Sequence, residues 1–174
     1  KTHLLIDDFQ KSKKVGAIGF LDRAQRWVCR KADKIIVPSE YLADVVNGWG
    51  ISKDKIKVIY NGVDFKPSDL SKEDARRKLG IFGHIILSVG RLVPWKGFRM
   101  LIKIMPSVFE INQAFRLVIV GEGPDKKILE TMIKNLGLEK KVFLVGRKSQ
   151  EELAVYMAAA DMFVLNTGYE GFSH

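Results

Sequence analysis

A turn rich in glycine and basic residues is the first place in this sequence where residue types and spacing suggest chemistry. The segment Gly90-Arg91-Leu92-Val93-Pro94-Trp95-Lys96-Gly97 directly follows an apolar run that ends at Val89. A guanidinium group offers a planar fork to phosphate oxygens, and an ammonium group offers a compact point charge. Gly90 allows the backbone to turn and a ligand to approach closely. The alternative is two solvated cations beside a helix start, where the helix dipole disfavours them. We therefore predict that Arg91 and Lys96 bind an anion.

A second segment of interest, Glu170-Gly171-Phe172-Ser173, follows a later apolar run. The residues after Glu170 are typical of a helix N-terminus, whose free N–H groups favour an anion. Glu170 can accept hydrogen bonds from hydroxyl groups, as a sugar-binding carboxylate does. Alternatively, its negative charge can simply stabilise the helix N-terminus through the helix dipole. The segment alone does not decide between these two roles. Together the two segments predict a cationic clamp for a diphosphate beside an acid that binds hydroxyls.

Short apolar runs supply the elements that must position these segments. Six of them are rich in valine and isoleucine and show little polar alternation: Ile35–Val37, Ile56–Tyr60, Ile85–Val89, Leu117–Val120, Val142–Val145 and Met162–Leu165. Such runs are typical of strands buried on both faces of a parallel sheet. Helical periodicity fills the gaps, so the order from Ile85 onward is that of a doubly wound α/β domain. Ligands bind outside the carboxyl ends of such strands, where both segments lie.

The stretch from Phe65 to Leu70 contains Pro67, Ser68 and Asp69 and is predicted to be a linker. We predict that residues 1–66 are the C-terminal part of one α/β domain. Residues 67–174 are then the N-terminal part of a second domain, so both domains are incomplete. A chain that holds only these parts is expected to be inactive by itself.

Several kinds of site are excluded by what the motifs lack. The P-loop spacing is absent, and Lys126 occupies the third glycine position of the dinucleotide fingerprint that Gly121-Glu122-Gly123 begins. The three histidines have no metal-ligand spacing, and Asp-x-Asp does not occur, so we predict no metal and no cofactor. Cys29 is the only cysteine, which excludes an internal disulfide. Ser39 is predicted to cap a helix and not to act as a nucleophile.

The formal net charge of +9 implies an anionic partner, which can be phosphate, nucleic acid or acidic lipid. The charge is divided between the chain's parts, with +5 in residues 1–68 and +4 in residues 69–174. The aromatic side chains that interleave with basic residues in a base-stacking platform are missing. A non-catalytic basic α/β module that binds nucleic acid or another polyanion is therefore the weaker alternative, and we predict no nucleic-acid partner.

The helix predicted from Ala17 to Arg30 is amphipathic. Its apolar stripe consists of Phe20, Leu21, Ala24, Trp27 and Val28, with Arg23, Arg26 and Arg30 opposite. We favour packing of this stripe into a core. The alternative is peripheral contact with an anionic membrane.

Motifs in a fixed order connect this chain to a known family. They are Pro38-Ser39-Glu40-Tyr41, Ile59-Tyr60-Asn61-Gly62-Val63-Asp64, Gly90-Arg91-Leu92 with Lys96-Gly97, Gly121-Glu122-Gly123-Pro124, Val142-Phe143-Leu144-Val145-Gly146, Ala160-Asp161 and Tyr169-Glu170-Gly171-Phe172. From about Ala32 to His174 the chain resembles a retaining glycosyltransferase of family 4, the group 1 type with the GT-B fold. That fold consists of two Rossmann-like doubly wound domains.

The resemblance implies a nucleoside-diphosphate sugar as donor and a saccharide or lipid-linked acceptor, with transfer of a hexose-type sugar and retention of configuration. It implies that Arg91 and Lys96, beside Gly90, hold the diphosphate by electrostatic stabilisation that needs no metal. Glu170 would bind sugar hydroxyls, the backbone of Gly171, Phe172 and Ser173 would contact sugar or phosphate, and Gly146 and Arg147 would lie by the nucleobase. We expect a cytoplasmic protein, with peripheral contact at the inner face of the membrane as an alternative. Asn166-Thr167 departs from the family's common Pro-Ser, and Ser173 departs from a common glycine.

Overall fold

The chain forms two compact units, with the division between Asp64 and Phe65. The computed structural model describes residues 15–62 and 64–167, and side chains from residue 19 onward. Residues 64–69, which span this division, carry no helix or strand.

The first unit is a small parallel pair of strands with two helices. It contains α2 (Val15–Lys31), β1 (Ile35–Val37), α3 (Glu40–Gly48), the 3-10 turn η1 (Lys53–Lys55) and β2 (Ile56–Val58). β1 and β2 pair in parallel over their full lengths. Ser39 accepts a hydrogen bond from the Leu42 N–H at 3.3 Å and so caps α3, as predicted. A core of Val37, Val46 and Ile51 holds these elements together.

The apolar stripe of α2 does not pack into this core. The side chains of Phe20, Leu21, Trp27 and Val28 are 71%, 64%, 62% and 57% exposed. The helix instead contacts the unit through its other face, where Cys29 packs against the core and Arg26 lies 5.5 Å from the ring centroid of Trp49. The expectation of a core-packed stripe is therefore not met within the described residues of this unit. Among those residues, no helix combines the length and apolarity that crossing a membrane requires.

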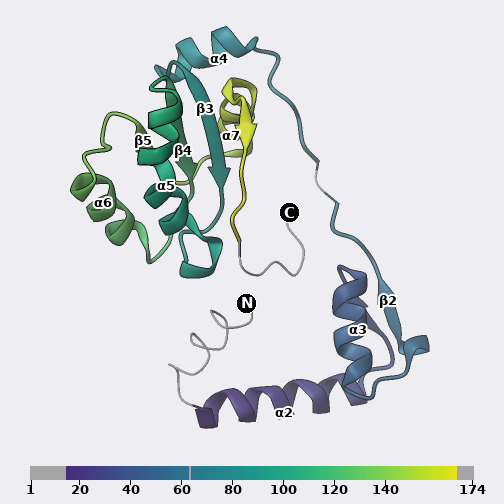
Figure 1. The fold of residues 1–174 in the computed structure, drawn as a ribbon. Helices are drawn as coiled ribbons and strands as arrows, with labels where there is room; N and C mark the ends of the chain where they lie inside the picture. The colour runs from purple at the N-terminus through teal and green to yellow at the C-terminus, as the bar shows by residue number, and fades with distance from the viewer. Residues whose placement is uncertain (1–14, 63, 168–174) are drawn as a thin grey trace. The chain divides into compact units, whose positions relative to one another are not determined.

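The second unit is a four-stranded parallel sheet with helices on both faces (Figure 1). Its elements are α4 (Lys72–Leu79), β3 (His84–Val89), the 3-10 turn η2 (Pro94–Lys96), α5 (Phe98–Ile111), β4 (Phe115–Val120), α6 (Lys126–Asn135), β5 (Val142–Leu144), α7 (Gln150–Ala159) and β6 (Met162–Phe163). The strand order is β5-β4-β3-β6. Every predicted strand is present, although β2, β5 and β6 are shorter than the apolar runs that predicted them.

Side chains of alternating residues in the central strands pack into two separate hydrophobic cores, one on each face of the sheet. On one face Ile86, Leu117 and Ile119 pack with α5 and α6. On the other face Leu87, Val118 and their neighbours pack with α4 and α7. Both faces of β3 and β4 are thus buried, as the continuous apolar runs predict. The doubly wound α/β architecture is confirmed for this unit.

The sheet reverses its direction of growth beside β3. From β3 the chain adds β4 and β5 on one side, and it then returns to place β6 on the other side. The topological switch point of this sheet therefore lies between β3 and β6. Open α/β sheets bind ligands at such a point, outside the carboxyl ends of the strands. The predicted clamp segment begins there, directly after Val89.

Asp161 directly precedes β6 and lies at the edge of the sheet where the strands begin, opposite the carboxyl ends. Its carboxylate accepts a hydrogen bond from the Ile85 N–H at 2.8 Å and forms ion pairs with Lys72 and Arg76 of α4. Burial by itself would raise the pKa of Asp161, but these hydrogen bonds together hold it below its usual value. The carboxylate therefore ties α4 to β3 and β6.

Candidate functional site

The loop after β3 is held by buried side chains and by the loop after β4. Leu92 and Val93 are only 1% and 4% exposed, so the middle of the loop is anchored in the unit. The Leu92 N–H donates to the Glu122 carbonyl at 2.9 Å, and the Asp125 N–H donates to the Leu92 carbonyl at 3.0 Å. The two loops therefore form one connected surface at the carboxyl ends of β3 and β4.

Close approach of these loops depends on Gly121. Its φ of +148° is one that residues with side chains rarely adopt, and a Cβ there would lie 1.9 Å from the Gly90 carbonyl oxygen. A Cβ at Gly90 would meet only ordinary contacts, the nearest being Phe98 Cζ at 3.5 Å. Of these two residues, Gly121 is therefore the one that must be glycine for contacts within the chain.

The two predicted cations both lie near Gly90. Arg91 is exposed, and within the described residues its side chain forms no ion pair or hydrogen bond. Lys96 is half-buried at the end of η2. Its Cδ and Cε lie 3.8 and 3.9 Å from the position that a Cβ at Gly90 would take, so its stem covers that residue. The structure therefore brings Lys96 back over Gly90, two residues before α5 begins.

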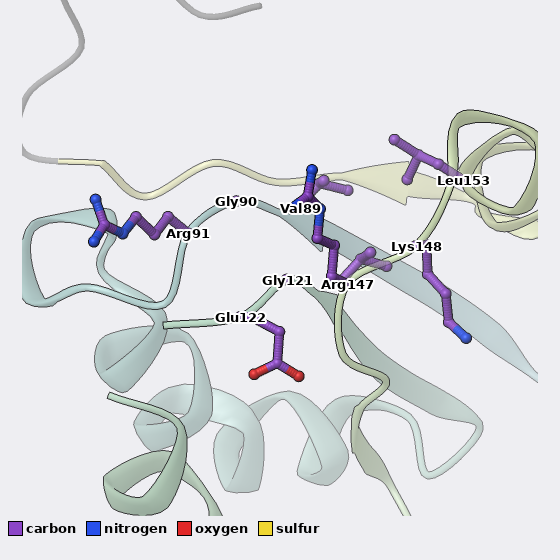
Figure 2. Close-up of a pocket in the computed structure, with 9 residues that line it drawn as sticks. Val89, Gly90, Arg91, Gly121, Glu122, Arg147, Lys148 and Leu153 are labelled. Carbon is purple, nitrogen blue, oxygen red and sulfur yellow. The ribbon is translucent and has the colours of Figure 1, made fainter. Parts of the chain in front are cut away.

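A cavity of about 380 Å³ opens at the carboxyl ends of three neighbouring strands (Figure 2). It is lined by Val89, Gly90, Arg91, Val120, Gly121, Glu122, Arg147, Lys148 and Leu153. Three predicted site residues, Gly90, Arg91 and Arg147, are among them. Gly146 stands just behind, where its carbonyl accepts a hydrogen bond from the Gly121 N–H at 2.8 Å. Figure 2 shows Arg91 and Arg147 on different loops at the border of the cavity, with the Arg91 guanidinium directed away from Arg147.

Glu122, Lys148 and Leu153 line the cavity but were not predicted as site residues. Glu122 pairs with Lys126 at 2.9 Å, and this hydrogen bond raises the pKa of Lys126. Lys148 pairs with Glu152 at 3.3 Å. Glu122 and Lys148 follow the ends of β4 and β5, so the rule that ligands bind at strand ends could have identified them. The cavity wall therefore mixes three cations with one carboxylate.

Arg99 is one of eight Lys and Arg residues in the basic stretch 75–116, but its charge stabilises the fold. Its guanidinium donates to both carboxylate oxygens of Asp125, at 2.9 and 2.8 Å. Asp125 is 5% exposed. The hydrogen bond to Asp125 raises the pKa of Arg99 above its usual value. This bidentate pair joins the first turn of α5 to the start of α6, beneath the loop after β3.

The loop after β6 lies against the Lys96 turn. Asn166 Nδ2 donates to the Gly97 carbonyl at 3.4 Å, and Thr167 Oγ1 donates to the Trp95 carbonyl at 3.3 Å. The predicted sugar-binding residues Glu170, Gly171, Phe172 and Ser173 lie outside the described residues. Within the described ranges, no group of three or more His, Cys, Asp or Glu side chains is placed to hold a metal ion.

Family models match almost the whole chain. The model for "Glycosyl transferases group 1" matches residues 71–174, and the model for "Glycosyltransferase Family 4" matches residues 3–66. Residues 67–70 separate the two matches, close to the division between the structural units after Asp64.

Curated relatives from bacteria and archaea are similar over most of this chain. Mannosylfructose-phosphate synthase of Agrobacterium fabrum is 32% identical over 83% of the chain, which spans 35% of that protein. A 4-alpha-N-acetylgalactosaminyltransferase of Campylobacter jejuni that acts on a diphospho-undecaprenol substrate is 34% identical over 83% of the chain, which spans 38% of that protein. An uncharacterized glycosyltransferase of Methanocaldococcus jannaschii is 34% identical over 79% of the chain. The chain thus spans little more than a third of the length of these relatives.

Solved structures share the fold. The Anabaena protein HepE in complex with UDP and glucose superposes with a TM-score of 0.69 at 26% identity, over 84% of this chain and 41% of HepE. Sucrose-phosphate synthase from Thermosynechococcus elongatus superposes with a TM-score of 0.71 at 26% identity, over 86% of this chain and 38% of that enzyme. The α/β architecture described above is therefore of the GT-B type, and the chain covers part of it.

Proposed function

Because this chain belongs to the group 1 glycosyl transferases, we propose that it transfers a hexose-type sugar from a nucleoside-diphosphate sugar to a saccharide or lipid-linked acceptor, with retention of configuration. The observation that carries this proposal is the cavity at the carboxyl ends of β3, β4 and β5, which Arg91 and Arg147 both line. Neighbours of the same fold contain UDP, UDP and glucose, or UDP-glucose.

Each predicted residue receives a role that its chemistry allows. Arg91 and Lys96 bind the diphosphate beside Gly90 and stabilise the negative charge that develops on the leaving nucleoside diphosphate. Such preorganised cations require no metal or other cofactor for this step. The loop at Gly146 and Arg147 contacts the nucleobase. Glu170 accepts hydrogen bonds from sugar hydroxyls, and the backbone of Gly171–Ser173 contacts sugar or phosphate.

The two units are assigned to the two sides of this reaction. We place residues 67–174 in the domain that binds the donor and residues 1–66 in the domain on the acceptor side. Relatives named for saccharide and lipid acceptors support both acceptor classes. Catalysis requires both sides of the site, so we propose that the 174-residue chain alone is inactive.

Binding of nucleic acid is not part of the proposal, because three cations of the basic stretch 75–116 already have partners within the unit. Arg76 pairs with Asp161, and Arg99 pairs with Asp125. Arg116 donates to the carbonyls of Gln113 and Phe115. These side chains are committed to the fold and do not form a continuous track for a phosphate backbone.

The protein is proposed to act in the cytoplasm, with a peripheral membrane position as the alternative. The exposed stripe of α2, next to Arg23 and Arg30, favours that alternative in the first unit. Co-sedimentation of the full-length protein with vesicles tests it. Binding that rises with the fraction of acidic lipid supports the membrane position, and indifference to acidic lipid rules it out.

The donor site is tested by calorimetry and steady-state kinetics on the full-length protein, with UDP and GDP as probes. Arg91→Ala and Lys96→Ala each remove a cation from the diphosphate. Loss of a hydrogen bond to a charged group costs about 1.5–3 kcal/mol, so affinity should fall about 10- to 100-fold. Lys103→Ala removes an exposed cation on α5 that does not line the cavity, and it serves as the charge-matched control. Unchanged affinity and turnover in both site variants would refute the assignment.

A further inference from the structure

The loop after β6 holds the carbonyl groups on both sides of Lys96. Thr167 Oγ1 donates to the Trp95 carbonyl at 3.3 Å, and Asn166 Nδ2 donates to the Gly97 carbonyl at 3.4 Å. Trp95 and Gly97 are the residues immediately before and after the lysine. A single neighbouring loop therefore restrains the backbone on each side of Lys96.

Backbone contact reinforces this restraint. Gly97 has a φ of +70°, and a Cβ there would lie 2.0 Å from the Asn166 carbonyl oxygen. The Gly97 carbonyl also accepts a hydrogen bond from the Met100 N–H of α5 at 3.0 Å. The turn that carries Lys96 is thus fixed between the loop after β6 and the first turn of α5.

The restraining loop is itself fixed to the sheet. Its Val164 N–H donates to the Leu87 carbonyl at 2.9 Å. The buried Ser88 hydroxyl donates to the Val164 carbonyl at 2.6 Å. Residues 166 and 167 therefore start from a point held against β3, the strand that leads into the clamp. The position of the turn that carries Lys96 is thus fixed relative to β3.

We propose that Asn166 and Thr167 are positioning residues that direct Lys96 toward the donor diphosphate. The inference rests on the function proposed above. A lysine side chain is long and flexible, and a misplacement of about 1 Å in a catalytic group can cost about 100-fold in rate. The two side chains act through the backbone of Lys96 and need not touch the donor.

The experiment is a double-mutant cycle on the full-length protein. Dissociation constants of UDP and GDP are measured by calorimetry, the tighter ligand is used throughout, and kcat and KM for the donor are measured in parallel. Thr167→Val removes the hydroxyl at constant shape and should weaken binding about fivefold, the value of one hydrogen bond. Thr167→Ser should restore binding to within about twofold of the wild type. Asn166→Ala removes the second bond and should act in the same direction.

Coupling to Lys96 separates positioning from a general loss of structure. In a Lys96→Ala background, Thr167→Val should have no further effect on the affinity for the nucleotide. Thr131→Val is the matched control, because Thr131 Oγ1 also donates to a backbone carbonyl, that of Lys127 at 2.9 Å, on the exposed side of α6. This control should leave nucleotide affinity unchanged.

The outcomes distinguish this inference from the function on which it rests. If Lys96→Ala alone leaves nucleotide affinity unchanged, the site assignment is wrong and the positioning role falls with it. If Lys96→Ala weakens binding while Thr167→Val has no effect, or has the same effect in both backgrounds, only the positioning role is overturned. Failure of Thr167→Ser to restore binding, or equal losses in Thr131→Val, would also overturn it.

Discussion

Replacing Gly97 by alanine tests the contact between the Lys96 turn and the loop after β6. The new Cβ would lie 2.0 Å from the Asn166 carbonyl oxygen and 2.7 Å from Asn166 Nδ2, whereas an ordinary van der Waals contact begins near 3.4 Å. The two backbones must therefore separate by about 1.4 Å, the difference between these values. That displacement breaks the hydrogen bonds of Asn166 and Thr167 to the turn.

The magnitude follows from two separate costs. An alanine in the left-handed region costs about 1–2 kcal/mol of stability. Loss of two hydrogen bonds adds about 1–3 kcal/mol, at about 0.5–1.5 kcal/mol each. Gly137 provides a matched control, because its φ of +66° is nearly that of Gly97 and a Cβ there would meet nothing within 4 Å. Gly137→Ala should therefore cost only the first amount.

Urea unfolding of the full-length protein measures the free energy of unfolding of both variants, and calorimetry measures their affinity for UDP or GDP. Gly97→Ala should be less stable than Gly137→Ala by about 1–3 kcal/mol, and its nucleotide affinity should fall at least about fivefold. Gly137→Ala should bind the nucleotide normally. If the two variants are equally stable and bind alike, the loops do not touch as described and the reasoning is refuted.

Two further variants test the ion pairs that hold the second unit together. The folded-state pKa of Asp161 is depressed, so the stability that its charge provides is present above its unfolded pKa of about 3.9 and is lost as the pH falls through the folded value. Urea unfolding between pH 7 and pH 3 should show a smaller loss of stability in Asp161→Asn than in the wild type; equal losses would contradict the role given to its ion pair with Arg76. Arg99→Leu leaves the buried carboxylate of Asp125 without its bidentate partner and should lower the free energy of unfolding by about 1–3 kcal/mol. Adding Asp125→Asn should recover part of this loss, and a fully additive double variant would argue against a direct pair.

Much of the local structure could be predicted because its signals lie within a few residues of one another. The apolar runs predicted all six strands, and the periodicity between them predicted the helices. Ser149 and Glu152, three residues apart, form a capping box, and Ser71 accepts a hydrogen bond from the Asp74 N–H at the same spacing. Buried strands and helix caps depend on the types of side chain and on their neighbours within a few residues. Both can be read directly from a sequence.

Part of the site could be predicted for the same reason. The turn after the strand that ends at Val89 predicted Gly90 and Arg91, and the family resemblance implied Arg147; the structure places all three around one cavity. The role of Arg99 could not be predicted, because its partner Asp125 lies 26 positions away. The exposure of the apolar stripe of α2 could not be predicted either. Its periodicity is that of a helix face that packs into a core, but periodicity does not show whether another surface covers that face.

The sequence by itself determined the class of fold, the order of the strands along the chain and the resemblance to a family of glycosyl transferases, which the family models confirm. Only the tertiary structure decided which cations remain at the cavity and which are committed to the fold. It also brought Thr167 to Trp95, across 72 positions of the chain. The physical reason is that strands and caps arise from local preferences, whereas ion pairs and loop contacts exist only after the sheet has brought distant segments together.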